Sequence, residues 1–469
     1  DTWPQRALFT TKSCRFNRAS TDYLNRTPAS AGNRTTFTFS FWIKRASYLS
    51  NFLRLIEAGA NTTNRSFFTL DGDDKLELNH RDGAEDVVNL TTTPLFRDVS
   101  AWYHIVLAID TTQGTASNRV KVYLNGTQIT AFDTETYPSL NFDFDFNSTD
   151  GHYLGTSVNE VGSFDGYMSE VVMIDGQQLD PTSFGVANSD GVWTPIIYTG
   201  TFGTNGFNLQ FENAAALGED SSPNGNTFTV NNLTSIDQST DYPVVNYATL
   251  NVLNSTLTNT VLSEGNLKLV GGRQSANYTY ITGTIAASSG KWYWEVKAVD
   301  NSEIDQVGVA KMDLAQFSNI DSSGGLYATT YGGKGVQMSN GNKVGDGAQS
   351  AYMGGFSAND ICMVALDLDN NEITFGRNGL WSNGSGGADQ AYGDATAAYT
   401  NLTAGAMYVP AQCMRDSGAS NPGTMEYNFG NPTFSISSSN ADGNGYGNFE
   451  YAPPSGYYAL NTANLAEFG

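Results

Sequence analysis

TFTFSFW, residues 36–42, alternates polar and apolar side chains with a period of two residues. This alternation is typical of a β-strand that buries one of its faces. Similar segments follow at 102–109 and 119–124, and the Asn-Gly pair at 125–126 is a strong signal for a tight hairpin. Another apolar run covers 164–174. Because helical periodicity is nearly absent, these segments predict an all-β first half.

The second half of the chain repeats the strand pattern after a base-free transition at 236–264 that is rich in Asn, Thr, Ser and Leu. The last stretch, 436–469, is rich in Ser, Asn, Gly and Tyr, and we expect an extended tail without a core of its own. The predicted strands lie at 290–296, 307–310, 360–367 and 372–375. Their spacing predicts a second β-sandwich.

The charge distribution excludes several classes of partner. The chain has 469 residues and a net charge of −23, yet only 15% of its residues are charged. Between Lys121 and Lys268 there are seventeen acidic residues and no base. Binding to nucleic acid or to an anionic membrane needs clustered Lys and Arg. We therefore expect no nucleic-acid partner, and no membrane insertion either, because no apolar run is long enough.

The first block resembles the LamG-like, concanavalin A-type lectin/glucanase family. Four segments carry the resemblance: FTFSFWIKRA (37–46), AWYHIVLAIDTT (101–112), RVKVYLNG (119–126) and FDGYMSEVVMIDGQQLDPTSFG (164–185). A strand–turn–strand at 207–230 also resembles this family and is expected to close the sandwich. The resemblance implies a jelly roll over 1–235 with an N-terminal arm. That arm is basic, with Arg6, Lys12, Arg15, Arg18 and Arg26. The interpretation we favour is a solvated first strand, and the alternative is that the arm docks on an acidic neighbour in an assembly.

The second block resembles the SPRY family over 265–435. The matching segments are SSGKWYWEV (288–296), QVGVA (306–310), NDICMVALDLDNNEITFGRNG (359–379) and YNFGNPTF (427–434). The fold expected for the whole chain is therefore all-β, with two tandem β-sandwich domains, LamG/concanavalin A-like and then SPRY. SPRY relatives bind proteins or peptides through loops at one end of the sandwich. This resemblance implies ligand-binding roles for Tyr327, Tyr331, Tyr352, Trp381 and Arg415. An equally favoured alternative is that several of these aromatic residues pack at the edges of strands.

The pairing of these two domains on an Asn/Gly/Thr-rich background looks like fibre or virion-surface structural proteins of marine bacteriophages, the cyanophages among them. The resemblance implies a location on the virion, contacts with other virion proteins and with a host-surface glycan or protein, and a homo-oligomer, trimeric if the protein is a fibre. Two alternatives remain open. One is a secreted or cell-surface bacterial carbohydrate-binding protein, and the other is a divergent glycan hydrolase.

The sequence predicts that the protein is not an enzyme. Glucanases of the jelly-roll type carry alternating carboxylates on one strand, which supply the pair that hydrolysis needs. Only Asp143 and Asp145, in the expected strand 141–146, approach this pattern, and we interpret them as its solvated face. No Gly-x-Ser-x-Gly segment is present, and His104 lies in the dense strand at 102–109, which favours a core imidazole.

No cofactor is expected, but a calcium ion is possible. Asp71, Asp73 and Asp74 form an acidic hairpin tip, and Ca²⁺ prefers carboxylate and carbonyl oxygens in short loops. The alternative is an ordinary acidic turn. The three cysteines lack zinc-binding spacing, and we interpret them as small buried hydrophobic residues, although Cys362 and Cys413 could pair.

Overall fold

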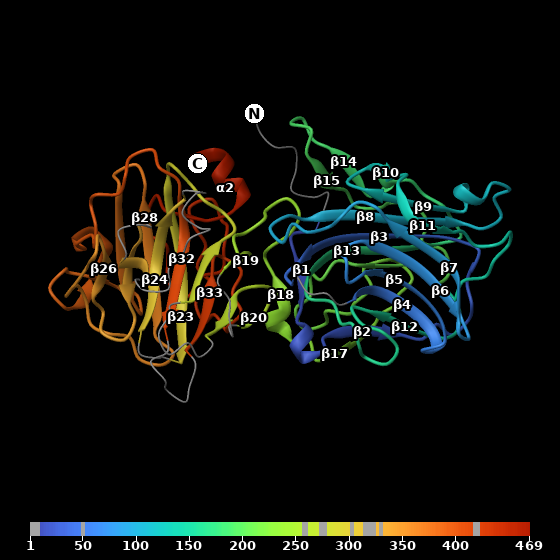
Figure 1. The fold of residues 1–469 in the computed structure, drawn as a ribbon, viewed down its shortest axis with the longest axis horizontal. Coiled ribbons are helices and arrows are strands. Elements are labelled where there is room, and N and C mark those ends of the chain that lie inside the picture. The colour runs from blue at the N-terminus through green and yellow to red at the C-terminus, as the bar shows by residue number, and fades with distance from the viewer. Residues whose placement is uncertain are drawn as a thin grey trace. The chain divides into compact units, whose positions relative to one another are not determined.

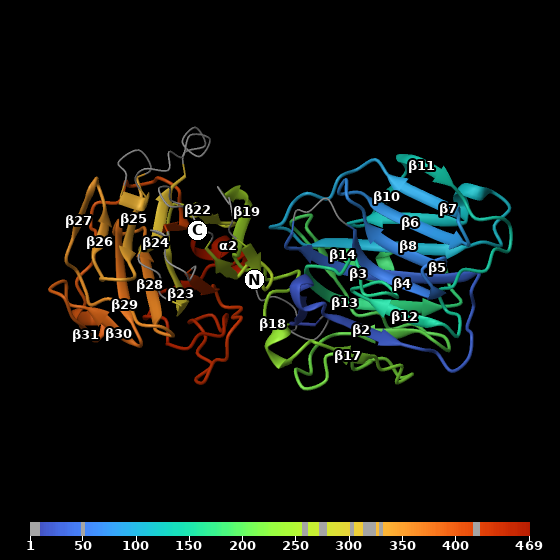
Figure 2. The ribbon, with the colours of Figure 1, turned by 60° about the horizontal axis from the view of Figure 1, so that its bottom comes forward.

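A computed structural model describes the chain except for residues 1–9, 48–51, 256–260, 272–278, 301–303, 313–324, 328–331 and 416–422. The chain forms two compact units, Asp1–Val244 (unit 1) and Val245–Gly469 (unit 2). Their boundary falls inside the expected transition at 236–264. Both units are built of β-sheets (Figure 1, Figure 2), as the sequence predicts.

Unit 1 is a sandwich of two large antiparallel sheets. In the first sheet, strands run in the order β10 (Thr127–Ile129), β9 (Val120–Leu124), β8 (Tyr103–Asp110), β3 (Thr36–Arg45), β13 (Gly166–Asp175), β1 (Ser13–Phe16) and β18 (Gln238–Ser239), with β16 (Phe207–Leu209) also on β13. In the second, the order is β11 (Phe132–Thr136), β7 (Glu85–Thr92), β6 (Leu76–Asp82), β5 (Asn64–Leu70), β4 (Leu53–Asn61), β12 (Gly151–Leu154), β2 (Tyr23–Arg26) and β17 (Thr229–Asn231). A small hairpin of β14 (Gly185–Ala187) and β15 (Trp193–Pro195) is separate.

The stretch that opened the sequence analysis forms β3, the central strand of the first sheet. Its alternation places Phe37, Phe39 and Phe41 in the core between the two sheets, each at most 1% exposed. The hairpin predicted after 119–124 is also present: β9 turns into β10 at Asn125 and Gly126, whose φ angles are 46° and 82°. Positive φ at both positions is what a type I′ turn requires, and Asn-Gly is the pair that tolerates it.

Segment 207–230 belongs to unit 1, as the resemblance implied. β16 pairs with β13 of the first sheet, and β17 pairs with β2 of the second, so the segment contributes one strand to each sheet. Arg15 of the expected basic arm is fully buried and donates to the Ile236 carbonyl at 2.8 Å. It is therefore part of the folded unit and not available to a neighbour.

One strand prediction in this unit is wrong. Residues 141–146 form turns and irregular backbone instead of a strand. The alternation still determines burial, because Phe144 and Phe146 lie in the core while Asp143 is exposed. The phenylalanines pack edge-on against Phe37 at 5.9 Å, so ring packing holds the segment without a hydrogen-bonded ladder.

Unit 2 is the second sandwich. Its first sheet has the order β19 (Leu250–Ser255), β22 (Thr279–Gly283), β32 (Tyr408–Arg415), β24 (Ile304–Lys311), β25 (Lys334–Gln337), β26 (Lys343–Gly345) and β27 (Ala348–Ser350). The second has β20 (Val261–Ser263), β21 (Lys268–Val270), β33 (Thr424–Asn428), β23 (Lys291–Asp300), β28 (Ile361–Asp367), β29 (Glu372–Arg377), β30 (Leu380–Ser382) and β31 (Ala388–Gln390), with β34 (Tyr458–Ala459) also on β23. Cys362 and Cys413 are buried and unpaired, and so is Cys14 of unit 1.

Residues 436–469, expected to be an extended tail, pack onto unit 2. β34 continues the sheet beside β23, and the chain ends in α2 (Thr462–Phe468), the one α-helix among the described residues. Leu460 is part of the core, and Phe468 stacks on Tyr458 at 3.9 Å. Apolar residues hidden among polar ones therefore anchor this stretch. No helix in the described part of the chain is long and apolar enough to cross a membrane.

Candidate functional site

Of the residues predicted to bind ligand in unit 2, two are described in full and both are buried. Tyr352 is 1% exposed and donates a hydrogen bond to the Thr396 carbonyl at 2.6 Å. Trp381 is 4% exposed and packs on Tyr392, with 4.9 Å between ring centroids. The prediction that these rings present contact area at the surface is corrected, because both are packing residues. The side chains of Tyr327 and Arg415, and Tyr331 as a whole, lie outside the described residues.

The acidic turn does not form the possible calcium site. The Asp71 carboxylate accepts the backbone N–H groups of Asp73 and Lys75, both at 2.9 Å, and so closes the turn. Asp74 accepts from the buried Arg45 at 2.7 Å and forms a second ion pair with Arg97 at 3.1 Å. Its charge is therefore already neutralised by two guanidinium groups. Across the described residues, no three His, Cys, Asp or Glu side chains are placed to hold a metal ion.

The sequence candidates for catalysis do not form a catalytic pair. Burial raises the pKa of Asp145 to about 6, and its neighbours are Arg34 at 3.4 Å and His80 at 3.6 Å. His104 stacks on Trp42 with 4.7 Å between centroids and accepts the indole N–H of Trp193 at 2.8 Å. Burial lowers the pKa of His104 to about 3. This imidazole is therefore a neutral core group, as its place in a dense strand indicated.

A polar cluster that the sequence analysis missed lies on the outward side of the second sheet of unit 1. Strand register determines which side chains face outward. Ile56 pairs with Phe68 and Phe68 with Leu78, and all three are in the core. The alternate pairs, Arg54 with Thr69 with Glu77 and Glu57 with Phe67 with Asn79, must therefore point away from it.

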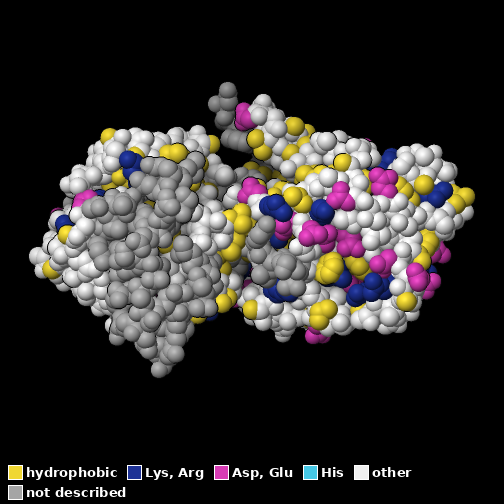
Figure 3. Space-filling view, viewed as in Figure 1, with side chains coloured by type: hydrophobic (Ala, Val, Ile, Leu, Met, Phe, Trp, Pro, Cys, Tyr) yellow, Lys and Arg dark blue, Asp and Glu magenta, His cyan; other side chains and the backbone are white. Residues whose placement is uncertain are grey.

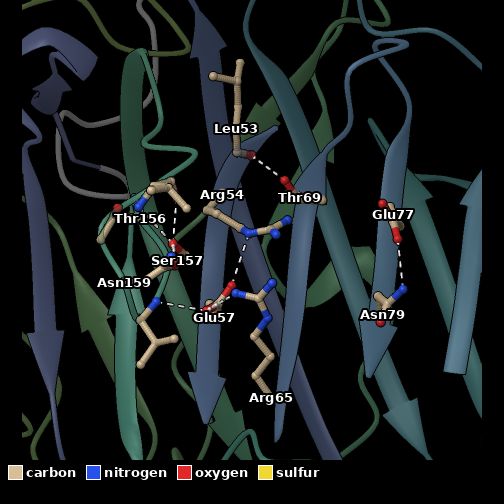
Figure 4. Close-up of polar contacts among 12 residues, drawn as sticks. Leu53, Arg54, Glu57, Arg65, Thr69, Glu77, Asn79, Thr156, Ser157 and Asn159 are labelled. Carbon is tan, nitrogen blue, oxygen red and sulfur yellow. Dashed lines mark hydrogen bonds and ion pairs between the residues drawn. The ribbon is translucent and has the colours of Figure 1, made fainter. Parts of the chain in front are cut away.

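We call the outward-facing residues Arg54, Glu57, Arg65, Glu77 and Asn79 the polar face. Figure 4 shows that they come from β4, β5 and β6, with the Arg54 and Arg65 side chains converging on Glu57.

Two guanidinium groups bind one buried carboxylate in this cluster. Glu57 is fully buried, and its Oε2 lies 3.1 Å from Arg54 Nε. Its Oε1 accepts from Arg65 Nη1 at 3.1 Å and from the backbone N–H of Val158 at 2.9 Å. Oε1 therefore accepts two hydrogen bonds, while Oε2 is held by the ion pair with Arg54 and accepts no hydrogen bond among the described residues. Glu57 holds the two guanidinium groups in place, and it is not free to act as a nucleophile or a base.

The Arg54 guanidinium lies between two phenylalanine rings. Its Cζ atom is 3.9 Å from the Phe67 centroid and 5.0 Å from the Phe52 centroid, and the side chain is 7% exposed. Burial lowers the pKa of Arg54 to about 10, and the opposing Glu57 charge limits the fall. Arg54 Nη1 makes no hydrogen bond within the described part of the chain. A buried donor without a partner costs about 1–3 kcal/mol, which a bound acceptor would remove.

The neighbouring strand β6 supplies acceptors. Asn79 donates from Nδ2 to Glu77 Oε1 at 3.0 Å, while its own Oδ1 has no hydrogen-bond partner among the described residues. Burial raises the pKa of Glu77. The polar face thus contains both donors and acceptors without hydrogen-bond partners among the described residues, and these atoms are buried.

A loop at 155–163 borders the polar face on the side of β12. Ser157 Oγ donates to the Val161 carbonyl at 2.6 Å, within the loop. Phe164 N–H donates to the Gly155 carbonyl at 2.7 Å and so joins the two ends of the loop. Its Val161 is 57% exposed, and the nearby Phe52 is 45% exposed. An apolar rim therefore stands directly beside the polar face.

One feature of the sequence points to this site, but the simple alternation of a regular strand does not predict it. Arg54 and Glu57 are three residues apart, so a regular strand would place them on opposite faces. The register shifts between Arg54 and Ile56, and both Leu55 and Ile56 enter the core. This bulge returns Glu57 to the side of Arg54. Two charges inside the apolar strand 53–58 were the available clue.

Comparison with known proteins agrees with the two-unit division. Residues 18–179, which include the polar face, match the family model described as "Concanavalin A-like lectin/glucanases superfamily". Residues 291–408 match the SPRY domain family. No curated protein matches the chain.

Several solved structures are similar to parts of the chain at low identity. The SPRY domain of human HERC1 is 16% identical, covering 38% of this chain and 96% of its own, with a TM-score of 0.29. Another human SPRY domain is 13% identical, covering 36% and 94%, with a TM-score of 0.25. A heptameric pentraxin from Limulus polyphemus is 16% identical, covering 36% and 76%, with a TM-score of 0.26. The chain thus contains a concanavalin A-like domain followed by a SPRY domain.

Proposed function

We propose that this chain is a non-catalytic binding protein whose unit 1 binds carbohydrate on the polar face. Domains of the two matched families fit a carbohydrate- or protein-binding role. The observation that carries the proposal is the Arg54 guanidinium, which is held by Glu57, lies between two rings and keeps an unused donor. Sites for sugars and other small ligands combine apolar surface with a few convergent polar groups.

The absence of catalysis is part of this proposal. Glycoside hydrolysis needs one carboxylic acid and one free carboxylate facing each other across the bond to be cleaved. Glu57 is engaged by two guanidinium groups and a backbone N–H, and Asp145 lies beside Arg34 and His80. Glu57 and Asp145 are therefore both held beside basic side chains.

The proposal includes a location on the surface of a marine phage particle. There the chain would associate with copies of itself and contact other virion proteins. It would also contact a glycan or protein on the host surface. Its support is the resemblance of the domain pair and the net charge of −23. Repulsion among acidic groups in such a chain is screened within about 10 Å or less in salty water. Mass spectrometry of purified particles from the source of the sequence tests the location. Absence of the chain from all particles would leave a secreted or cell-surface bacterial carbohydrate-binding protein.

A glycan array with the full chain tests the carbohydrate role. We expect at least one glycan to be retained by the wild type and lost with Arg54→Met. The same glycans are then incubated with the protein and analysed for cleavage. Turnover that disappears in Glu77→Gln or Asp145→Asn would establish the glycan hydrolase alternative. Retention of no glycan at all would refute the carbohydrate role.

A further inference from the structure

A lysine and an aspartate from distant parts of unit 1 meet in a place hidden from solvent. Basic and acidic side chains are intermixed on the visible face of unit 1 (Figure 3), but the side chains of Lys44 and Asp241 are 1% and 0% exposed. Lys44 Nζ lies 2.8 Å from Asp241 Oδ2, although the two residues are 197 positions apart in the chain. Lys44 belongs to β3, and Asp241 follows β18 by two residues. The contact therefore joins a central strand to the last segment of unit 1.

The Asp241 carboxylate is held at both of its oxygens. Oδ1 accepts the indole N–H of Trp102 at 2.9 Å, and Oδ2 accepts from Lys44. The backbone of Asp241 is held as well, because its N–H donates to Ser239 Oγ at 3.1 Å and its carbonyl accepts from Ser13 Oγ. Since Oδ2 is bonded directly to Cγ, this arrangement keeps the carboxyl carbon within reach of the amine.

Aromatic rings surround the pair. Lys44 Nζ lies 5.6 Å from the ring centroid of Tyr167, the residue that pairs with Lys44 across β3 and β13. Trp42, Trp102 and Tyr167 form one apolar cluster on this side of the sheet. A site without water does not hydrate two separate charges. The neutral form of the pair, an amine beside a carboxylic acid, is therefore less disfavoured here than it is for a pair at the surface.

We propose that Lys44 and Asp241 condense into an amide bond between Nζ and Cγ, a cross-link that the folded chain makes within itself. In the neutral pair, the Nζ lone pair attacks Cγ and the C–N bond forms. The Trp102 indole N–H stabilises the negative charge that develops on Oδ1. The bond from Cγ to Oδ2 then breaks, and Oδ2 leaves as water with its own proton and one proton from Nζ. No oxidant, reductant or added reagent is consumed.

The fold supplies the conditions for this step and gains a covalent ring from it. Reacting groups that are held in place behave as if their concentration were about 10⁵–10⁸ M. The bond would close residues 44–241 into one ring, and it does not depend on the proposed binding of carbohydrate. β18 has two residues and lies at the edge of the first sheet. Tension on the chain beyond residue 241 would then act on β3 instead of peeling β18 from that edge.

Mass spectrometry of the denatured full chain tests the cross-link directly. We expect the intact mass to be lower than the mass of the sequence by one water. The chain has no Lys or Arg between Lys121 and Lys268, so chymotrypsin is used for the digest instead of trypsin. Tandem mass spectrometry of the digest should then find a branched peptide that joins Lys44 to Asp241.

The matched control is a second lysine–aspartate pair, Lys291 and Asp367 of unit 2. The distance from Lys291 Nζ to Asp367 Oδ2 is 2.7 Å, and Nζ lies 5.7 Å from the Tyr457 ring centroid, but the Lys291 side chain is 33% exposed. We expect both residues in linear peptides of the same digest. The double variant Lys44→Met/Asp241→Asn removes both charges together, so no buried charge is left unpaired. It should have the full mass of its sequence.

The possible outcomes are distinct. A wild-type mass equal to that of the sequence, in fresh protein and after prolonged incubation of the folded chain, would overturn the cross-link and leave an ion pair. Loss of one water without the branched peptide would overturn the assignment to Lys44 and Asp241. A branched peptide at Lys291 as well would overturn the role given to burial. None of these results changes the expected outcome of the glycan array, so the cross-link and the proposed function fail separately.

Discussion

Glu57 in unit 1 and Glu295 in unit 2 both stand on the outward side of a sheet, and both are fully buried. Glu57 is neutralised by Arg54 and Arg65, beside an exposed phenylalanine. Glu295 instead accepts four hydrogen bonds from uncharged donors: Tyr293 Oη at 3.0 Å, Asn428 Nδ2 at 2.9 Å and the backbone N–H groups of Glu450 and Tyr451 at 3.0 and 2.7 Å.

The difference lies in what each glutamate organises. In unit 2 the chain covers its own sheet, because residues 449–451 lie across β23 and bring Phe449 against Tyr293, with 5.0 Å between ring centroids. In unit 1 the corresponding side of β4 to β6 keeps arginine and asparagine atoms without hydrogen-bond partners. Aromatic residues on the two sheets should therefore behave in opposite ways when they are removed.

The largest effect is expected for Trp381→Ala. Trp381 is 4% exposed within the covered side of unit 2, and removing a buried tryptophan costs about 3–5 kcal/mol. Hydrogen–deuterium exchange of β28 and β29 measures the loss for unit 2 alone. Glycan binding by unit 1 should not change. If unit 2 kept its stability and the chain lost its binding of glycan, Trp381 would instead be a ligand residue, as the resemblance to SPRY domains implied.

Glu57→Ala should cost unit 1 about 3 kcal/mol, because it leaves two largely buried guanidinium groups without their counter-ion. Exchange rates of the β4 and β5 amides report the change. Asp73→Ala is the control: Asp73 is exposed, and its substitution should stay within about 0.5 kcal/mol. Equal and small effects of both substitutions would mean that the Arg54–Glu57–Arg65 cluster does not support the sheet.

The third prediction concerns pH and unit 2. Burial raises the pKa of Glu295 to about 7, against an ordinary value of 4.5. A carboxyl with a raised pKa in the folded state contributes stability that is complete below about pH 4.5 and is lost as the pH rises to about 7. The loss is at most about 3 kcal/mol. Glu295→Gln cannot titrate, so the stability difference between wild type and variant, followed by exchange at β23, should change across this window. A constant difference would contradict the prediction.

Sequence reasoning succeeded where a local pattern decides the structure. Alternation in TFTFSFW predicted which side of β3 faces the core between the sheets, although Thr38 and Ser40 on its other side are buried as well. Asn125-Gly126 predicted the turn into β10. Both successes depend on neighbouring residues only. The strand expected at 141–146 was wrong for a related reason. Alternating burial arises from ring packing there, and single backbone hydrogen bonds, such as that from Phe144 N–H to the Arg34 carbonyl, do not form the continuous ladder that defines a strand.

The candidate sites depended on long-range contacts, and there the sequence was least informative. Trp381 is buried through packing on Tyr392, which contacts Tyr457, a residue of the stretch expected to be a loose tail. The ion pair between Asp74 and Arg45 joins residues that are 29 positions apart, so their spacing in the sequence could not predict it. The polar face depends on a bulge at Leu55 and on strand pairing, and neither is visible in a single sequence without the partner strands.

The smallest effect on stability is expected for Phe52→Ala, the counterpart of Trp381→Ala on the outward side of the second sheet of unit 1. Phe52 is 45% exposed, so little apolar contact is lost. The ring also covers the Arg54 guanidinium, whose Nη1 has no hydrogen-bond partner in the described chain. Water reaching that donor in the variant offsets the lost contact. The net change, measured by exchange at β4, should therefore stay within about 0.5 kcal/mol. A loss above about 2 kcal/mol would mean that Phe52 closes the sheet as Phe449 does in unit 2, and that this side of unit 1 is not open to a ligand.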